Sequence, residues 1–211
     1  MTSSKKTIQY IKDNTNKENY VTMFVAGSIP QELIKGSDLD IFFIVKEEKK
    51  NEFFENITNI MNKYLKNKQD IKYTFFRGPI KYKNKGLIHF VIYLKSKKPD
   101  FEDRAQFIGE SRPVLKSLLA KHEIINGERI EQLLKNVDFS NTNITKKDIS
   151  KMRTKHERLI KEDKICYSEW KKTKNGWQFI RTNKKVSKYL KNYLNNYYTK
   201  HINNALKKLK K

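Results

Sequence analysis

The segment that decides the fold is an apolar run that opens with two carboxylates, Ser37-Asp38-Leu39-Asp40-Ile41-Phe42-Phe43-Ile44-Val45. Its length and its branched and aromatic residues predict a β-strand. Since successive strand side chains point to opposite faces, Asp38 and Asp40 are expected to project together while Leu39 and Ile41 enter the core. Two carboxylates this close repel each other unless a cation lies between them. Mg²⁺ suits the pair because it takes oxygen ligands and is commonly completed by substrate phosphates.

A second apolar run precedes this strand and ends in a Gly-Ser turn. It reads Tyr20-Val21-Thr22-Met23-Phe24-Val25-Ala26, and Gly27 and Ser28 follow directly. Glycine lets the backbone approach a ligand closely, and a serine hydroxyl can bond a phosphate oxygen. Pro30 stands where a short helix could begin, and a helix N-terminus attracts anions. The order strand, Gly-Ser turn, short helix and strand with Asp-x-Asp therefore predicts a site for phosphate and metal.

These residues resemble the signature of the DNA polymerase β-like nucleotidyltransferase superfamily, in which an apolar strand and Gly-Ser or Gly-Gly are followed by Asp-x-Asp or Asp-x-Glu. Gly27, Ser28, Asp38 and Asp40 occupy the positions of that signature. The resemblance implies that Asp38 and Asp40 bind Mg²⁺, or Mn²⁺ in its place, and that Ser28 contacts the triphosphate. It covers residues 20–95 most closely and extends, more loosely, to about residue 135.

The superfamily usually has a third carboxylate on a later strand, where it serves as general base or metal ligand. The matching strand here is residues 86–94, and His89 holds the expected acidic position. His89 could be a working substitute, since imidazole accepts a proton near neutral pH and can bind a metal, although Mg²⁺ prefers oxygen. Alternatively another carboxylate completes the site, or His89 is an ordinary sheet-edge histidine of a weak or inactive relative. The carboxylates considered for that place are Asp70, Asp100, Glu102 and Asp103. The candidate catalytic residues are therefore Asp38, Asp40 and His89.

Cations and hydroxyls near the Gly-Ser turn are candidates for binding the nucleotide. Lys35, Arg77 and Arg112 could each reach a triphosphate, and each could equally be an ordinary surface cation in so basic a chain. With the turn residues, the predicted nucleotide-binding set is Gly27, Ser28, Lys35, Ser37 and Arg77.

The remaining pattern of the first part predicts an α+β fold, a nucleotidyltransferase-like mixed sheet with helices on one side. Residues 47–67 are expected to form a helix, and residues 70–82 and 86–94 a long β-hairpin. Residues 113–119 and 126–130 resemble helical elements that follow the core in this superfamily.

Positive charge is concentrated behind this core. The chain has 46 Lys and Arg against 23 Asp and Glu, a formal net charge of +23, and residues 145–211 alone hold 21 basic and 5 acidic residues. Such a surface attracts polyanions, and we expect RNA to be the partner. An AT-rich genome also favours Lys and Asn codons, so part of the excess could reflect codon usage.

The basic region is expected to form a helix, a β-hairpin and a second helix. Thr145, followed by Asp148, is typical of a helix start, and the helix should run over residues 145–163. Two β-like runs within residues 165–181 meet at Asn175-Gly176, a strong hairpin signal, and residues 184–211 have helical periodicity. Trp170 and Trp177 flank the turn with lysines between them, which would suit single-stranded nucleic acid; alternatively both indoles anchor the hairpin to the core. The predicted nucleic-acid-binding residues are Lys171, Lys172, Lys174, Trp177, Lys184 and Lys185.

Composition, cysteine content and the lengths of the apolar stretches predict the domain organisation and the cell compartment. We expect a catalytic domain over residues 1–136 and a basic helix-hairpin-helix extension over residues 145–211, that is, a basic helical C-terminal region containing a β-hairpin. The single cysteine, Cys166, fits a reducing compartment. No stretch has transmembrane length and no signal-peptide core is visible, so we expect a cytoplasmic protein without membrane insertion. The oligomeric state is left open.

Together these features predict a Mg²⁺-dependent nucleotidyltransferase. It would transfer a nucleoside monophosphate from a nucleoside triphosphate to a hydroxyl, expected to be on RNA, and release pyrophosphate. The alternatives are an inactive RNA-binding protein with the same fold, or a transferase that modifies a protein or a small molecule.

Overall fold

The computed structural model describes residues 2–27, 29–77, 85–95, 122–130, 143–162, 164–185 and 187–209. The first part of the chain contains β1 (Thr2–Ser3), α1 (Ser4–Asn14), the 3₁₀ helix η1 (Lys17–Asn19), β2 (Tyr20–Val25), β3 (Glu32–Leu33), β4 (Asp38–Val45), α2 (Lys50–Leu65), β5 (Ile71–Thr74), β6 (Phe76–Arg77), β7 (Gly86–Leu94) and β8 (Glu123–Gly127). The last part contains α4 (Lys146–Glu162), β9 (Lys164–Thr173), β10 (Gly176–Lys185) and α5 (Lys188–Leu209).

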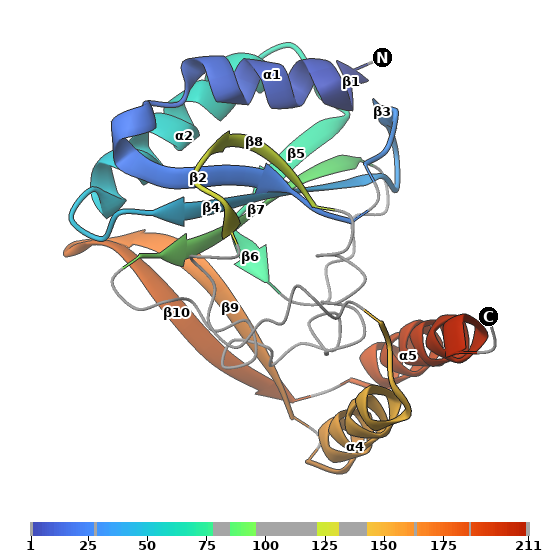
Figure 1. Ribbon diagram of the computed structural model, residues 1–211. Coiled ribbons are helices and arrows are strands. Elements are labelled where there is room, and N and C mark those ends of the chain that lie inside the picture. Colours follow the sequence, from blue (N-terminus) through green and yellow to red (C-terminus); the bar gives the residue numbers. More distant parts are fainter. Residues whose placement is uncertain are drawn as a thin grey trace.

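A mixed five-stranded sheet forms the centre of the molecule (Figure 1), with the strand order β5-β7-β4-β2-β8. Strand β7 lies parallel to both β4 and β5, whereas β2 is antiparallel to β4 and to β8. The α+β class and the mixed sheet predicted from the sequence are therefore confirmed.

The sheet buries both of its faces. On one face, side chains such as Ile41, Phe43 and Phe90 pack with α1 and α2, whose inward residues include Ile11 and Phe53. On the other face, the second cluster consists of Val21, Phe24, Ala26, Phe42, Ile44, Val91, Tyr93 and Ile130. The central strand β4 is buried from Ile41 to Val45 because it contributes to both clusters. Only its first residues are free to carry polar side chains.

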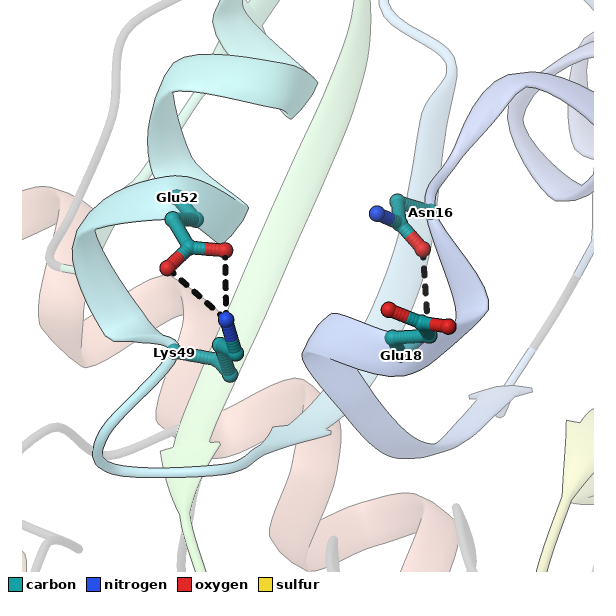
Figure 2. Close-up of polar contacts among 4 residues, drawn as sticks. All are labelled: Asn16, Glu18, Lys49 and Glu52. Atoms are coloured by element: carbon teal, nitrogen blue, oxygen red, sulfur yellow. Dashed lines mark hydrogen bonds and ion pairs between the residues drawn. The ribbon is translucent and has the colours of Figure 1, made fainter.

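Short-range polar contacts occur in the turns at the end of the sheet where β4 stops (Figure 2). Asn16 accepts a hydrogen bond from the backbone N–H of Glu18, 3.0 Å away, which starts η1. Lys49, just before α2, pairs with Glu52 at 2.9 Å, and both side chains are exposed. These contacts set the turns that join α1 to β2 and β4 to α2, and they lie away from the two aspartates.

The C-terminal hairpin packs against this core. Strands β9 and β10 pair antiparallel, and β9 also pairs with β6, so the hairpin extends a second, three-stranded sheet. At the turn Gly176 has a φ of 85° and pairs with Thr173, so the turn residues lie one position earlier than Asn175-Gly176. Figure 1 shows the two long strands running away from α2 toward α4 and α5, which contact each other.

The helix α4 begins as its sequence predicts. The Asp148 carboxylate accepts hydrogen bonds from the Thr145 N–H at 2.9 Å and from its hydroxyl at 2.8 Å, while the Asp148 N–H donates to the Thr145 Oγ1. This reciprocal capping satisfies groups that a helix start leaves unpaired. None of the described helices is long and apolar enough to span a membrane.

Three expectations about local structure are wrong. Residues 70–82 and 86–94 do not form a hairpin, because β5 and β7 are parallel and the chain first leaves the sheet through β6, which pairs with β9. No helix begins at Pro30, because Glu32 and Leu33 form β3, which pairs with β1. Residues 126–129 are not helical, since residues 123–127 form β8 alongside β2, and only Ile130 of this segment has a 3₁₀ conformation. The segment 113–119 lies outside the described residues.

Candidate functional site

The two aspartates and the histidine singled out in the sequence lie together at the end of the sheet where β4 begins. Asp38 and Asp40 begin β4, and the parallel register places His89 of β7 directly beside Asp40. His89 Nδ1 lies 2.9 Å from Asp40 Oδ1, within hydrogen-bond distance. The side chains of His89 and Asp40 are 17% and 29% exposed, so the pair is partly shielded from water.

The geometry of this cluster suits a cation. One ligand atom from each of Asp38, Asp40 and His89 lies within 4.8 Å of the other two, so the group could hold a metal ion. Two carboxylates supply the hard oxygen ligands that Mg²⁺ prefers, while an imidazole nitrogen would be better suited to Mn²⁺ or Zn²⁺. Since His89 is engaged with Asp40, the two carboxylates are the residues that fit Mg²⁺.

The electrostatics of Asp38 point the same way. Although the Asp38 side chain is exposed, the protein around it displaces enough water to raise its pKa from 3.8 to about 6. The negative charge of Asp40 adds to this rise, and His89 opposes it. A carboxylate that is costly to ionise in the metal-free protein is stabilised when a cation shares its charge.

This shift predicts a pH dependence of stability in the presence of a chelator. The folded state holds the Asp38 proton more tightly than the unfolded chain, so this residue's contribution to the free energy of unfolding decreases as pH rises from about 4 to about 6. Asp38→Asn removes this dependence, and the variant should gain stability relative to the wild type over that interval. Thermal denaturation at several pH values with EDTA measures it; parallel curves for the two proteins would contradict the assignment.

His89 is placed to orient Asp40 rather than to meet an incoming hydroxyl. Its Nε2 atom is buried and has no hydrogen-bond partner among the described residues. An atom shielded from solvent is badly placed to take a proton directly from a substrate. The neutral tautomer with hydrogen on Nδ1 would donate to the Asp40 carboxylate, as outer groups commonly do beside metal-binding residues.

Substitutions at His89 should therefore separate orientation from proton transfer. His89→Asn keeps a short N–H donor beside Asp40 and should retain part of any metal affinity, whereas His89→Ala should lose about 10- to 100-fold. Titration of Mn²⁺ by calorimetry measures this difference. His89→Asp tests the remaining alternative, because a gain in transferase activity would mark His89 as the replacement of an ancestral carboxylate.

Of the other carboxylates proposed for the third position, the structure describes Asp70, and Asp70 does not join the cluster. Asp70 lies just before β5, two strands from β4, and is not among the described groups that could hold a metal. Asp100, Glu102 and Asp103 fall outside the described residues, so their part in the site stays a prediction.

The predicted nucleotide-binding residues lie at different places. Gly27 follows β2 and lies at the same end of the sheet as Asp38. Its φ of 86° is a left-handed conformation that favours glycine. The Ser37 hydroxyl is used inside the turn, where it accepts from the Ile34 N–H at 2.9 Å and donates to the Ile34 carbonyl at 2.7 Å. Lys35 is exposed in the same turn. Ser28 and Arg112 lie outside the described residues.

Arg77 belongs to a different sheet from the aspartates. It pairs in β6 with Ser168 of β9, in the three-stranded sheet. Its backbone has therefore left the five-stranded sheet that carries Asp38.

A cation that the sequence analysis missed shares the aspartate face. Lys72 of β5 and Asp38 of β4 both pair with Leu87, which lies between them on β7. The alternation of β5 could have indicated an outward Lys72, because Ile71 is buried and Tyr73 packs on the core. Its place on the same sheet face as Asp38, with Leu87 between them, follows from the parallel pairing of β5 with β7, whereas the predicted hairpin would have paired these strands antiparallel.

The hairpin-turn residues predicted to bind nucleic acid lie at the other end of the sheet. The Trp177 N–H donates to Asn51 near the start of α2, so the turn lies beyond the end of β4, about 23 Å along that strand from Asp38. Lys172 pairs with Glu55 at 2.8 Å and Lys171 with Glu169 at 2.7 Å. The exposed residues Lys174 and Lys185 lie at the turn and at the opposite end of the hairpin; Lys184 precedes Lys185 in β10.

Trp177 does not offer a face to a base. It is 8% exposed and stacks on Phe54 of α2, with ring centroids 4.7 Å apart and planes 15° from parallel. Its Nε1 donates to Glu55 at 3.1 Å, and Trp170 is 6% exposed in the same cluster. These contacts favour the alternative that both indoles anchor the hairpin to the core, and a role of Trp177 in binding nucleic acid stays a prediction.

Comparison with protein-family models, with curated proteins and with solved structures finds no match for this chain.

Proposed function

We propose that this protein is a metal-dependent nucleotidyltransferase that moves a nucleoside monophosphate from a nucleoside triphosphate to a hydroxyl and releases pyrophosphate. The observation that carries the proposal is the pair of carboxylates on one face of β4, joined to a Gly turn at the end of the neighbouring strand. This arrangement places metal ligands, and a glycine whose backbone a phosphate group can approach closely, at the same end of the sheet. It agrees with the signature that the sequence resembles.

Each residue of the cluster has a separate role in this proposal. Asp38 and Asp40 bind Mg²⁺, or Mn²⁺ in its place, and His89 holds the Asp40 carboxylate in position. Gly27 leaves room for a phosphate group against the backbone. When bound, the metal neutralises phosphate charge and lowers the pKa of an attacking hydroxyl.

Transfer of label from nucleoside triphosphates tests this proposal, and the same assay identifies the acceptor. The full chain is incubated with each α-labelled ribonucleoside triphosphate, Mg²⁺ or Mn²⁺ and total cellular RNA, and label is followed in RNA, protein and small molecules. Label in RNA supports the proposed acceptor, and label only elsewhere indicates a transferase for protein or small molecules. RNA binding without transfer of label to any of the three would favour the alternative of an inactive, RNA-binding relative.

The basic face of α4 supports a polyanionic acceptor. The helix buries Asp148, Ile149 and Met152 and exposes its opposite side. The exposed charged residues described on it are Lys146, Lys147, Lys151, Arg153, Glu157 and Lys161. Like charges four residues apart, as at Lys147 and Lys151, destabilise a helix unless an anion offsets them. Since the apolar side is already packed, the helix offers charge to a polyanion rather than an apolar face to a membrane.

Neutralising this face should weaken RNA binding through its salt dependence. Lys147→Gln with Lys151→Gln removes two cations and should reduce the slope of log K against log salt by about 2, if both contact phosphates. Lys17→Gln with Lys63→Gln removes the same charge from exposed positions elsewhere and is the matched control. Filter binding to a mixed RNA at several salt concentrations measures both. Equal slopes for the two variants would show that net charge, not α4, governs binding.

A further inference from the structure

A second histidine lies at the aspartate end of the sheet, on the side of the Gly27 turn. Strand β2 lies between β4 and β8, and its last residue, Val25, pairs with both of them. One residue further along, the same antiparallel registers place Ala26 between Asp40 and His122. The Cα atoms of Asp40 and His122 are therefore about 10 Å apart, twice the spacing of neighbouring strands.

The alternation of side chains puts His122 on the same face of the sheet as the aspartates. Ile124, two residues after His122, packs against the cluster that contains Ala26 and Phe42. Phe42 in turn follows Asp40 by two residues. Because side chains two residues apart in a strand point to the same face, His122 and Asp40 project from the face that this cluster covers.

Only small residues separate the two side chains. Ala26 carries a methyl group and is 3% exposed, and Gly27, which has no side chain, follows it. A group that is bound to a metal at Asp40 and also seated against the Gly27 turn lies on the β2 side of β4, where His122 is placed. His122 is partly buried, so its ring meets less competing water than an exposed side chain would.

We propose that His122 binds the phosphate chain of a nucleotide held at the two aspartates and the Gly27 turn. The inference rests on the proposed function, since it requires a metal-bound phosphate at this end of the sheet. An imidazole N–H donates to an anionic phosphate oxygen, and such a charge-assisted hydrogen bond is stronger than a neutral one. The phosphate chain is then contacted from three successive strands, by the metal on β4, the turn after β2 and the histidine before β8.

His89 and Lys72, which share this face, are less suited to the role. The strand order β5-β7-β4-β2-β8 puts both of them on the opposite side of β4 from the Gly27 turn. The Nε2 atom of His89 is also buried, and its Nδ1 atom is engaged with Asp40. A phosphate chain seated at the turn therefore lies nearer to His122 than to either of them.

Calorimetric titration of the full chain with inorganic tripolyphosphate tests this contact without depending on base preference or turnover. The chain's many lysines also bind phosphate nonspecifically, so the compared quantity is the Mg²⁺-dependent binding that Asp38→Asn removes. His122→Ala should weaken this component about tenfold, and His122→Gln, which keeps an N–H donor, should weaken it less. Glu123→Gln changes the next residue, whose side chain alternation directs to the other face, and should not weaken it.

Proton NMR of the imidazole rings shows whether His122 itself meets the ligand. The chain has four histidines, and the resonance that His122→Gln removes is that of His122. This resonance should shift when tripolyphosphate is added with Mg²⁺, and the shift should be absent in Asp38→Asn. Weaker binding by His122→Ala together with an unmoved resonance in the wild type would show a structural role and overturn the contact.

The outcomes separate this inference from the proposed function. If Asp38→Asn removes Mg²⁺-dependent binding and His122→Ala binds like the wild type, the His122 contact is overturned while the metal site stands. If the wild type shows no Mg²⁺-dependent binding of tripolyphosphate, both are overturned. Thermal midpoints of the His122 variants close to that of the wild type ensure that weaker binding reflects the lost contact.

Discussion

Asp38→Asn should lower nucleotidyl transfer by on the order of a thousandfold while leaving the fold intact. The substitution removes the negative charge that binds a metal but preserves the shape of the side chain. Stability should be maintained or improved near neutral pH, because partial loss of surrounding water and the charge of Asp40 raise the Asp38 pKa to about 6. Transfer of label under saturating Mg²⁺, together with a thermal denaturation curve, measures both effects.

The matched control for this prediction is Asp70→Asn. Asp70 is also acidic and lies near the start of a strand, but the described metal-binding group does not include it. It should therefore retain most of the activity. Full activity of Asp38→Asn would disprove the proposed metal site, and a comparable loss in Asp70→Asn would show that the third carboxylate comes from the start of β5.

Trp177→Ala should lower the free energy of unfolding by about 3–5 kcal/mol, the range for removing a large buried aromatic side chain. The indole is 8% exposed, stacks on Phe54 and contacts Phe75 edge-on at 5.6 Å. It also donates a hydrogen bond to Glu55. Truncation would leave a cavity between the hairpin and α2, because the surrounding rings can collapse only partly. Urea denaturation followed by circular dichroism measures the loss.

Conservative variants distinguish this structural role from a role in nucleic-acid binding. Trp177→Phe keeps the ring that packs on Phe54, so it should recover much of the stability and bind RNA like the wild type. Lys174→Ala, at the exposed turn, should leave stability unchanged within about 0.5 kcal/mol. A stable Trp177→Ala protein with weakened RNA binding would reverse the interpretation and restore the stacking role.

The elements with strong local patterns were predictable from the sequence. Strand β7 has the predicted bounds, while β2, β4 and α2 differ from their predicted ranges by only a few residues. In each of these elements the apolar residues recur every two or every 3.6 positions, or form a continuous run, and these patterns are typical of strands and helices that pack on a core. The start of α4 was also correct, because reciprocal capping depends only on residues three apart.

The elements that were missed depend on partners far away in the sequence. Strand β5 has the composition of a hairpin arm, yet it pairs parallel to β7. After β5 the chain forms β6, which pairs with β9, about ninety residues later in the sequence. Likewise β3 is two residues long and forms only through pairing with β1. Such pairings leave little trace in local composition, and alternation alone does not give strand direction.

The candidate site divides in the same way. The alternation of strand side chains was enough to place Asp38 and Asp40 on one face. Their spacing from the Gly-Ser turn predicted a site for phosphate and metal. The register between three strands places His89 beside Asp40, where it bonds, and places Lys72 on the same sheet face as Asp38. The burial of Trp177 could not be read from its neighbours, because a tryptophan between lysines suits either a core anchor or an exposed ring.

The docking of the hairpin on α2 has a consequence for biosynthesis. Phe54 and Phe75 obtain their covering indoles from Trp170 and Trp177, so the ribosome must make some hundred further residues before this apolar surface can be closed. During that time the nascent chain exposes an aromatic surface that is prone to association. A truncation after residue 136 would make the exposure permanent, so the N-terminal part alone should aggregate, or require chaperones, where the full chain folds.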